Sequence, residues 1–299
     1  MLAVIVQPIF AETYTEEWND AARQRTVPVR IYLPDVQRTG TCPIVLLSHG
    51  LGGSREGFPY LGEYWSRNGY VVIAMQHPGS DGPSIQRKPG KTVAESMSEA
   101  VNAENAQARV ADVKFVLDEL ERRAATDEKL KGRLDLEKIA VGGHSFGAYT
   151  ALSVVGRFPF DPEPRIKAAI AMSPSSPAGM SPAGLFRKIR VPVFHLTGTK
   201  DYSPIRPEIQ PGDRRIPFDR IDAPGQYFVN FKDGNHMLFS GHARPFGFSR
   251  MEKECQPLIQ EMTLKFLDAK LRHDTDAEKW LNGTPLTELL GERATLEKK

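Results

Sequence analysis

Residues 139–148 read IAVGGHSFGA, and they set the architecture predicted for the rest of this 299-residue chain. A short apolar run, typical of a buried strand, leads through the G-x-S-x-G pattern at residues 143–147 into small residues that favour a helix. Such a strand-to-helix turn strains the backbone of its central serine, and the flanking glycines allow neighbouring elements to pass closely. The pattern is weak by itself, but in this setting it predicts that Ser145 is a nucleophile.

Strand-like and helix-like segments alternate along the chain. Several of the strand-like segments are continuous apolar runs, which is typical of strands covered on both faces. This alternation predicts an α/β fold with a mostly parallel sheet of about eight strands and helices on both faces. The predicted strands cover residues 26–33, 43–48, 70–75, 139–142, 168–172, 191–196 and 226–231, and the predicted helices cover 58–68, 92–125 and 251–271.

Composition excludes several functional classes. Lys and Arg number 39 against 37 Asp and Glu, so no net positive field would attract nucleic acid. Two cysteines, Cys42 and Cys255, cannot form a disulfide framework or a Cys-rich zinc site, and whether they pair is left open. Because the sequence also lacks an H-E-x-x-H motif, we expect neither a metal nor a cofactor.

The N-terminus has two interpretations. The apolar run at residues 2–6 is far shorter than the roughly 20 residues of a membrane helix, so no transmembrane segment is predicted. Residues 1–11 are interpreted as the remnant of a signal peptide, which implies a secreted or periplasmic protein, or as an arm of a cytoplasmic one. Because no linker or repeat divides the rest, residues 12–299 are predicted to form a single domain. The sequence does not predict its oligomeric state.

A second glycine-rich segment, SHGLGG at residues 48–53, follows an apolar strand about 95 residues before the serine. Loops of this kind donate a backbone N–H to the oxyanion of acyl-transfer reactions, and their glycines let the chain curl without Cβ clashes. We therefore expect the backbone N–H groups of Leu51 and Phe146 to form an oxyanion hole. His49 lies within the loop and is expected to shape it by hydrogen bonding.

A nucleophilic serine also needs a base and an acid, which follow it in the chain order Ser, Asp, His. Of the seven histidines, we prefer His236 to His242, because it lies on a short turn directly after the last predicted strand. Asp201 follows the strand at residues 191–196 and is the predicted acid. The competing acids are Asp213, Asp219 and Asp222, and the other histidines are His49, His77, His144, His195 (expected in the core) and His273.

These motifs resemble the α/β-hydrolase superfamily over residues 20–285. More closely, the chain is similar to bacterial proteins known as predicted dienelactone hydrolases and to the platelet-activating-factor acetylhydrolase group. The shared segments are HGLGG (49–53), QHPGSD (76–81), GHSFG (143–147) and the loop of His236. The resemblance implies an α/β-hydrolase fold and an acyl-ester hydrolase with Ser145, Asp201 and His236 as its triad.

Two departures from that pattern matter. Dienelactone hydrolase has a cysteine nucleophile where this chain has Ser145, which argues against lactone chemistry of that kind. In the acetylhydrolases the acid follows the strand after the elbow strand, where this chain reads AMSP at residues 171–174. The acid is therefore expected one strand later, at Asp201. Rival functions are an acyltransferase or peptidase on the same fold and a catalytically silent binding module.

The substrate is expected to be a small or polymeric ester. Residues 173–190, with three prolines, are too few for a separate lid domain, so only the irregular loop 203–225 is left to shape an open entrance. An open site offers few apolar walls to a long acyl chain, which favours acetyl to butyryl groups and admits polyesters. The residues expected to contact substrate are His49, His77, Tyr202 and Met237.

Overall fold

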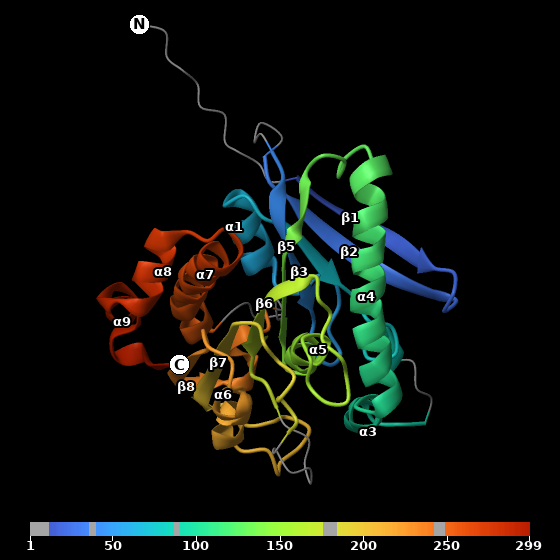
Figure 1. Cartoon of the computed structure of the whole chain (residues 1–299). Helices are drawn as coiled ribbons and strands as arrows, with labels where there is room; N and C mark the ends of the chain where they lie inside the picture. Colours follow the sequence, from blue (N-terminus) through green and yellow to red (C-terminus); the bar gives the residue numbers. More distant parts are fainter. Residues whose placement is uncertain (1–11, 36–39, 87–89, 176–183, 242–248) are drawn as a thin grey trace, which may run out of the picture.

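A nine-stranded sheet forms the centre of the computed structural model, which describes residues 12–35, 40–86, 90–175, 184–241 and 249–299 (Figure 1). The strand order is β1-β2-β4-β3-β5-β6-β7-β8-β9. The strands are β1 (Glu12–Asp20), β2 (Arg25–Leu33), β3 (Cys42–Ser48), β4 (Val71–Met75), β5 (Leu134–His144), β6 (Ile166–Met172), β7 (Val193–Lys200), β8 (Tyr227–Asn235) and β9 (Ala294–Lys298).

The direction of pairing divides this sheet into a parallel centre and antiparallel edges. The six strands from β4 to β8 pair in parallel. β2 pairs antiparallel with both β1 and β4, and β9 pairs antiparallel with β8. The predicted mostly parallel sheet is therefore confirmed, with nine strands in place of about eight.

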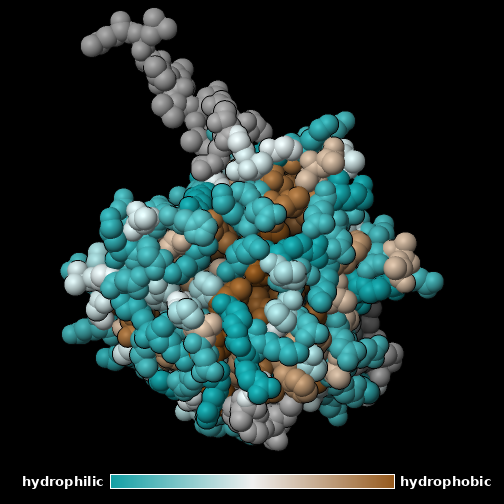
Figure 2. Space-filling view, in the orientation of Figure 1, coloured by the Kyte–Doolittle hydropathy of each residue, from teal (hydrophilic) through white to brown (hydrophobic). Residues whose placement is uncertain are grey.

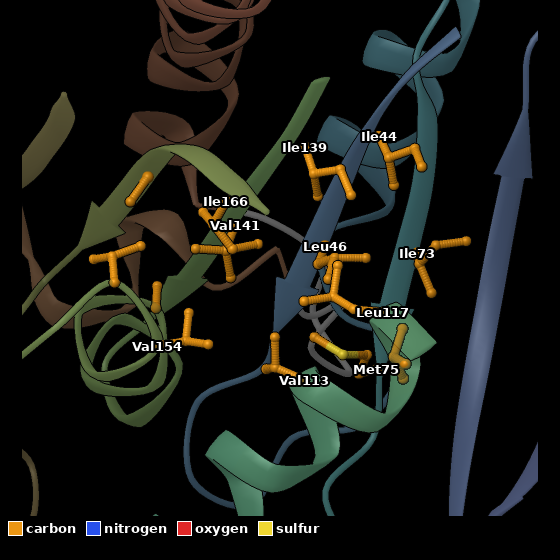
Figure 3. Close-up of a cluster of buried hydrophobic side chains, with 14 of the residues drawn as sticks. Ile44, Leu46, Ile73, Met75, Val113, Leu117, Ile139, Val141, Val154 and Ile166 are labelled. Atoms are coloured by element: carbon orange, nitrogen blue, oxygen red, sulfur yellow. The ribbon is translucent and has the colours of Figure 1, made fainter. Parts of the chain in front are cut away.

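The central strands are apolar throughout because both of their faces are covered. Every residue of β3 is buried. Side chains alternate across a strand, so Ile44 and Leu46 enter one hydrophobic core while Val45 and Leu47 enter the other. Figure 3 shows the first core, where Val113 and Leu117 of a long helix lie near residues of several strands.

Helices cover both faces of the sheet (Figure 1). On one face lie α4 (Ala103–Thr126) and α5 (Phe146–Val154), most of whose buried apolar residues belong to the first core. The second core lies under α1 (Pro59–Arg67), α7 (Arg250–Leu271), α8 (Thr275–Asn282) and α9 (Thr284–Leu290). The short elements are α2 (Gly82–Gln86), α3 (Val93–Ala100), α6 (Ile216–Arg220), η1 (Pro211–Arg215), η2 (His236–Phe239) and η3 (Gly291–Arg293).

The single helix predicted over residues 92–125 is two helices, α3 and α4. The side chain of Asn102 accepts a hydrogen bond from the Asn105 N–H and caps α4. The side-chain amide nitrogen of Asn105, Nδ2, donates to the Ala100 carbonyl at 2.9 Å and to the Gly79 carbonyl at 3.1 Å. Asparagine side chains compete with the helix for backbone hydrogen bonds, and here they interrupt it between α3 and α4. The apolar pattern of the sequence continues across this interruption and therefore predicts one helix.

Several elements were not predicted. Strands β1 and β9 and helices α8 and α9 lie outside the expected segments, and the loop at 203–225 contains η1 and α6. Residues 1–11, His242 and part of the 173–190 segment lie outside the described residues. None of the described helices combines the length and apolar character needed to cross a membrane.

α5 approaches the end of β3 so closely that only glycine fits at one point. A Cβ atom on Gly147 would lie 1.9 Å from the carbonyl oxygen of Ser48, and one on Gly143 would lie 2.6 Å from the same oxygen. This oxygen is a backbone atom, so no side-chain rotation can relieve either clash. The two glycines of the motif are therefore required by contact between elements.

We expect Gly147→Ala to lower the free energy of unfolding by about 3 kcal/mol or more, because β3 and α5 must separate to admit the methyl group. Gly212→Ala is the matched control, since no atom lies within 4 Å of a Cβ there, and it should change stability by less than about 0.5 kcal/mol. Urea denaturation of both variants measures this difference. Equal stability of Gly147→Ala and the parent chain would show that the contact does not exist.

Candidate active site

Ser145 lies on the sharp turn between β5 and α5. Its backbone angles are φ 57° and ψ −115°, a region that residues with a side chain rarely adopt. The serine N–H donates to the Met172 carbonyl of β6 at 2.9 Å, which fixes the turn against the sheet. The hydroxyl is held at the carboxyl end of the central parallel strands and is partly exposed.

The two predicted partners of this serine, His236 and Asp201, form a chain of hydrogen bonds with it. His236 Nε2 is 2.9 Å from Ser145 Oγ, and His236 Nδ1 is 2.7 Å from Asp201 Oδ1. Asp201 follows β7, and His236 follows β8. Because β5, β7 and β8 run parallel, their carboxyl ends meet at one edge of the sheet, and residues far apart in sequence become neighbours.

Asp201 is fully buried and well supplied with donors. Thr197 Oγ1 donates to Asp201 Oδ2 at 2.9 Å, and Arg214 Nε lies 3.3 Å from Oδ1. Burial raises the pKa of Asp201, but the hydrogen bond from His236 and the Arg214 charge outweigh it and hold the pKa below its ordinary value. The carboxylate is therefore ionised at neutral pH.

The competing acids have other surroundings. Asp213 accepts a hydrogen bond from the Gln210 N–H at 2.8 Å, and Asp219 pairs with Arg215 at 3.0 Å. Asp222 is exposed. Of the four candidates, Asp201 alone has a recorded contact with His236 within the described residues.

Arg214 was missed in the sequence. Its side chain is 2% exposed, and Nε donates to the Asp201 carbonyl at 3.1 Å. Nη1 lies 3.4 Å from the carbonyl oxygens of Ser173 and Pro174. Arg214 thereby joins the loop at 203–225 to the ends of β6 and β7. Nothing in that charged loop distinguishes Arg214 from its neighbours, so the sequence holds no signal for it.

The expected oxyanion donors lie beside the serine. Leu51, Phe146 and Ser145 line the same pocket. Phe146 is the first residue of α5, and the first N–H groups of a helix have no acceptor within it. The helix dipole also adds positive potential at this end.

The peptide that carries the Leu51 N–H is held from behind by His49. The His77 N–H donates to His49 Nε2 at 3.0 Å, so the proton of the His49 ring is on Nδ1. That Nδ1–H donates to the Gly50 carbonyl at 2.6 Å. Since this carbonyl and the Leu51 N–H belong to one peptide unit, the hydrogen bond polarises that N–H.

A second Ser-His-Asp sequence lies beneath this loop. His77 Nε2 is 3.0 Å from Ser48 Oγ, and His77 Nδ1 is 2.9 Å from Asp112 Oδ2. All three side chains are fully buried, and burial lowers the pKa of His77 to about 4. The prediction that His49 and His77 contact substrate is therefore corrected: both rings are enclosed and serve as internal hydrogen-bonding groups.

Arg109 of α4 crosses the same region and is fully buried. Its guanidinium donates to the His49 carbonyl and, at 2.8 Å in each case, to Ser80 Oγ and Thr150 Oγ1. It also lies 4.6 Å from the centre of the Phe146 ring. Arg109 occupies the buried stripe of the predicted helix with Val113 and Val116, and a charge on that stripe was an available signal.

The pocket in front of Ser145 has a volume of about 250 Å³. Tyr202 and Met237 do not line it, so their contact with substrate remains a prediction. The face seen in Figure 2 is largely hydrophilic, with hydrophobic atoms visible mainly in its recesses. The pocket is lined by Leu51, Val101, Asn102, Ala103, Ala106, Ser145, Phe146, Tyr149, Arg157, Phe158, Pro159, Ser175, Ser203, Ile205, Arg206, Ile209 and Arg214. In the described parts of the chain no three His, Cys, Asp or Glu side chains are grouped to hold a metal ion.

Comparisons with known proteins agree on one family. The family model for the alpha/beta hydrolase fold matches residues 43–203, more than half of the chain. Platelet-activating factor acetylhydrolase of Cavia porcellus is 22% identical over 280 residues, which cover 80% of this chain and 59% of that protein. Hydrolase ffsE of Aspergillus flavipes is 30% identical over 154 residues, which cover 50% of this chain and 30% of the relative. The chain thus spans less than two thirds of the length of these relatives.

A solved structure shares the fold over nearly the whole chain. A ferulic acid esterase from Streptomyces cinnamoneus superposes with a TM-score of 0.64 and covers 91% of this chain and 93% of its own. Sequence identity between the two is 20%. At that identity the likeness concerns the fold.

The buried histidines predict a dependence of stability on pH. Burial lowers the pKa of His77 and of His195 to about 4 and that of His144 to about 3, from an ordinary value of 6.5. As pH falls below 6.5, the unfolded chain takes up these protons before the folded one does. We therefore expect the free energy of unfolding to fall between pH 6.5 and 5, with a slope approaching about 1.4 kcal/mol per pH unit for each histidine.

Urea denaturation across this pH range measures the slope. His195→Gln should reduce this slope, because glutamine does not titrate. His195 lies on β7 away from Ser145, so the change leaves the proposed active site in place. His273→Gln, at an exposed position, is the control and should leave the slope unchanged. A stability that stays constant from pH 6.5 to 5 would contradict the burial of neutral histidines.

Proposed function

The chain belongs to the α/β-hydrolase family, and from this premise we propose that it is a serine esterase that hydrolyses carboxylic esters. The observation that carries the proposal is the hydrogen-bonded sequence from Ser145 Oγ through His236 to Asp201, with distances of 2.9 and 2.7 Å. In that arrangement a neutral imidazole accepts the serine proton while the carboxylate fixes its tautomer.

The first half of the proposed reaction acylates the enzyme. Ser145 Oγ attacks the ester carbonyl carbon as His236 Nε2 takes its proton. The carbonyl oxygen becomes an oxyanion that accepts hydrogen bonds from the Leu51 and Phe146 N–H groups. The tetrahedral intermediate then collapses, the bond to the alcohol oxygen breaks, and His236 returns its proton to that oxygen.

The second half releases the acid. Water attacks the acyl carbon while His236 takes one of its protons. The bond to Ser145 Oγ then breaks, and the proton passes from His236 to that oxygen, which restores the serine and frees the carboxylic acid. In both halves ionised Asp201 stabilises the imidazolium that forms, and it keeps its charge because Arg214 and Thr197 support the carboxylate.

The relatives support ester chemistry through their names, since they include an acetylhydrolase and a ferulic acid esterase. An acyltransferase or peptidase would share the acyl-enzyme, and a silent binding module would not form one. We favour the esterase because Ser145, which is hydrogen-bonded to His236, and the proposed oxyanion donors line one pocket that water can enter. We further propose that short acyl groups are preferred and that polymeric esters are also substrates.

Ser145→Ala should retain the fold and lose more than 99% of the hydrolysis of 4-nitrophenyl acetate, because the attacking oxygen is gone. The parent chain should react with a fluorophosphonate probe at Ser145, which peptide mass spectrometry identifies, and the variant should not. Residual activity above a few per cent in Ser145→Ala would remove Ser145 from the proposal.

A pair of histidine variants tests the base. His236→Ala should be as inactive as Ser145→Ala, whereas His242→Ala should keep most of the activity. The reverse outcome would transfer the role of the base to His242. Circular dichroism spectra of both variants confirm that each is folded before rates are compared.

The proposed preference for short acyl chains is tested with 4-nitrophenyl esters from acetate to laurate. We expect kcat/KM to be highest between the acetate and the butyrate, because on this proposal the methylenes of a longer chain stay outside the pocket and do not gain the roughly 0.8 kcal/mol of burial each. A steady rise of kcat/KM from the acetate to the laurate would contradict this preference while leaving the ester chemistry intact.

A further inference from the structure

The pocket in front of Ser145 has an unusual charge balance. Three arginines line it, Arg157, Arg206 and Arg214, and neither Asp nor Glu is among its lining residues. Arg214 is committed to Asp201. For Arg157 and Arg206 no ion pair with any carboxylate is found within the described residues. The pocket thus presents two cations that no carboxylate among the described residues neutralises.

Arg157 is the more constrained of the two. Its side chain is 1% exposed, and the guanidinium lies over the Tyr149 ring at 4.2 Å from its centre. Nη1 donates to the Phe158 carbonyl at 3.1 Å. Nε and Nη2 are buried without a hydrogen-bond partner in the described structure. Burial lowers the pKa of Arg157 and outweighs the interaction with the Tyr149 side chain, which raises it, so the environment is unfavourable for a cation.

The two unpartnered nitrogens are adjacent donors on one edge of the guanidinium, and that edge matches the two oxygens of a carboxylate. Other arginines of this chain use it in this way. Arg25 binds Asp112 through Nε at 2.7 Å and Nη2 at 2.9 Å. Arg165 binds Glu163 through Nε at 2.8 Å and Nη2 at 3.0 Å. In Arg157 the same edge has no carboxylate.

We propose that the substrate is an ester that also carries a carboxylate, which Arg157 binds through Nε and Nη2 while Ser145 attacks the ester. Arg206, half-buried on the loop at the pocket wall, adds a second positive charge. Tyr149 lies over the guanidinium face, and because Nε and Nη2 are themselves buried, binding of the carboxylate requires the pocket wall beside Arg157 to open. This inference rests on the proposed function and adds the class of substrate.

Matched pairs of esters test the inference. The first pair is mono-4-nitrophenyl glutarate and its methyl ester, which differ in the charge at the end of the acyl group. The second pair is 4-acetoxybenzoate and its methyl ester, which place the charge on the alcohol side. We expect kcat/KM for the anion to exceed that for its neutral partner at least tenfold in one pair, mainly through a lower KM.

Variants then assign the preference to the arginines. Arg157→Met should reduce the ratio of anion to neutral ester at least tenfold, and Arg157→Lys should restore little of it, because an ammonium lacks the paired donors. Arg206→Met, on a surface loop, should reduce the ratio less, and it covers the case in which Arg157→Met does not fold. Arg67→Met, at an exposed position of α1 on the other face of the sheet, should leave the ratio unchanged.

The outcomes separate the two proposals. Hydrolysis of the neutral esters at rates equal to or above those of the anions would overturn the carboxylate inference and leave the esterase standing. A preference for anions that persists in Arg157→Met and Arg206→Met would also overturn it. If none of the four esters is hydrolysed, the proposed function is refuted, and the carboxylate inference is refuted with it.

Discussion

The contact between the Ser48 carbonyl and the Gly147 backbone is the constraint around which the site is built. It joins the last residue of β3 to the first turn of α5, and Ser48 is also the register partner of Gly143 on β5. Leu51 lies three residues beyond Ser48, and Phe146 lies one residue before Gly147. Holding these two backbones together therefore brings both proposed oxyanion donors to one side of Ser145, and the His49 side chain then fixes the peptide of the Leu51 N–H.

Within the described residues two Ser-His-Asp groups are linked by hydrogen bonds, and their comparison shows how the group proposed to be catalytic differs from the enclosed one. Ser48, His77 and Asp112 are enclosed, and Asp112 also binds Arg23 and Arg25. Ser145 instead stands on a strained turn at the wall of a pocket. The residue types and distances are alike, so exposure and backbone strain carry the difference. The enclosed sequence supports the loop that faces the pocket.

The sequence predicted most of what depends on local pattern. The central strands, the turn at Ser145 and the order of Ser145, Asp201 and His236 follow from apolar runs and from motifs at fixed positions along the chain. The hydrogen-bond partners of Arg109 and Arg214 could not be predicted, because they lie many residues away and only the folded sheet brings them together, although the charge of Arg109 on an apolar stripe was visible in the sequence. β9 was missed since its exposed, charged residues lack an apolar pattern, and α4 was merged with α3 because hydrophobic spacing does not register an asparagine cap.

The two edge strands have a consequence for behaviour at high concentration. An unpaired strand edge offers N–H and C=O groups on which another chain can add a strand, and this is a route to aggregation. β1 carries Glu12, Glu16, Glu17 and Asp20, and β9 is a five-residue strand with Glu297 and Lys298. Bringing two β1 edges together would oppose like charges, and β9 is too short to template a long ladder. The charged residues that give β1 and β9 no apolar pattern thus protect the sheet from growing into fibrils.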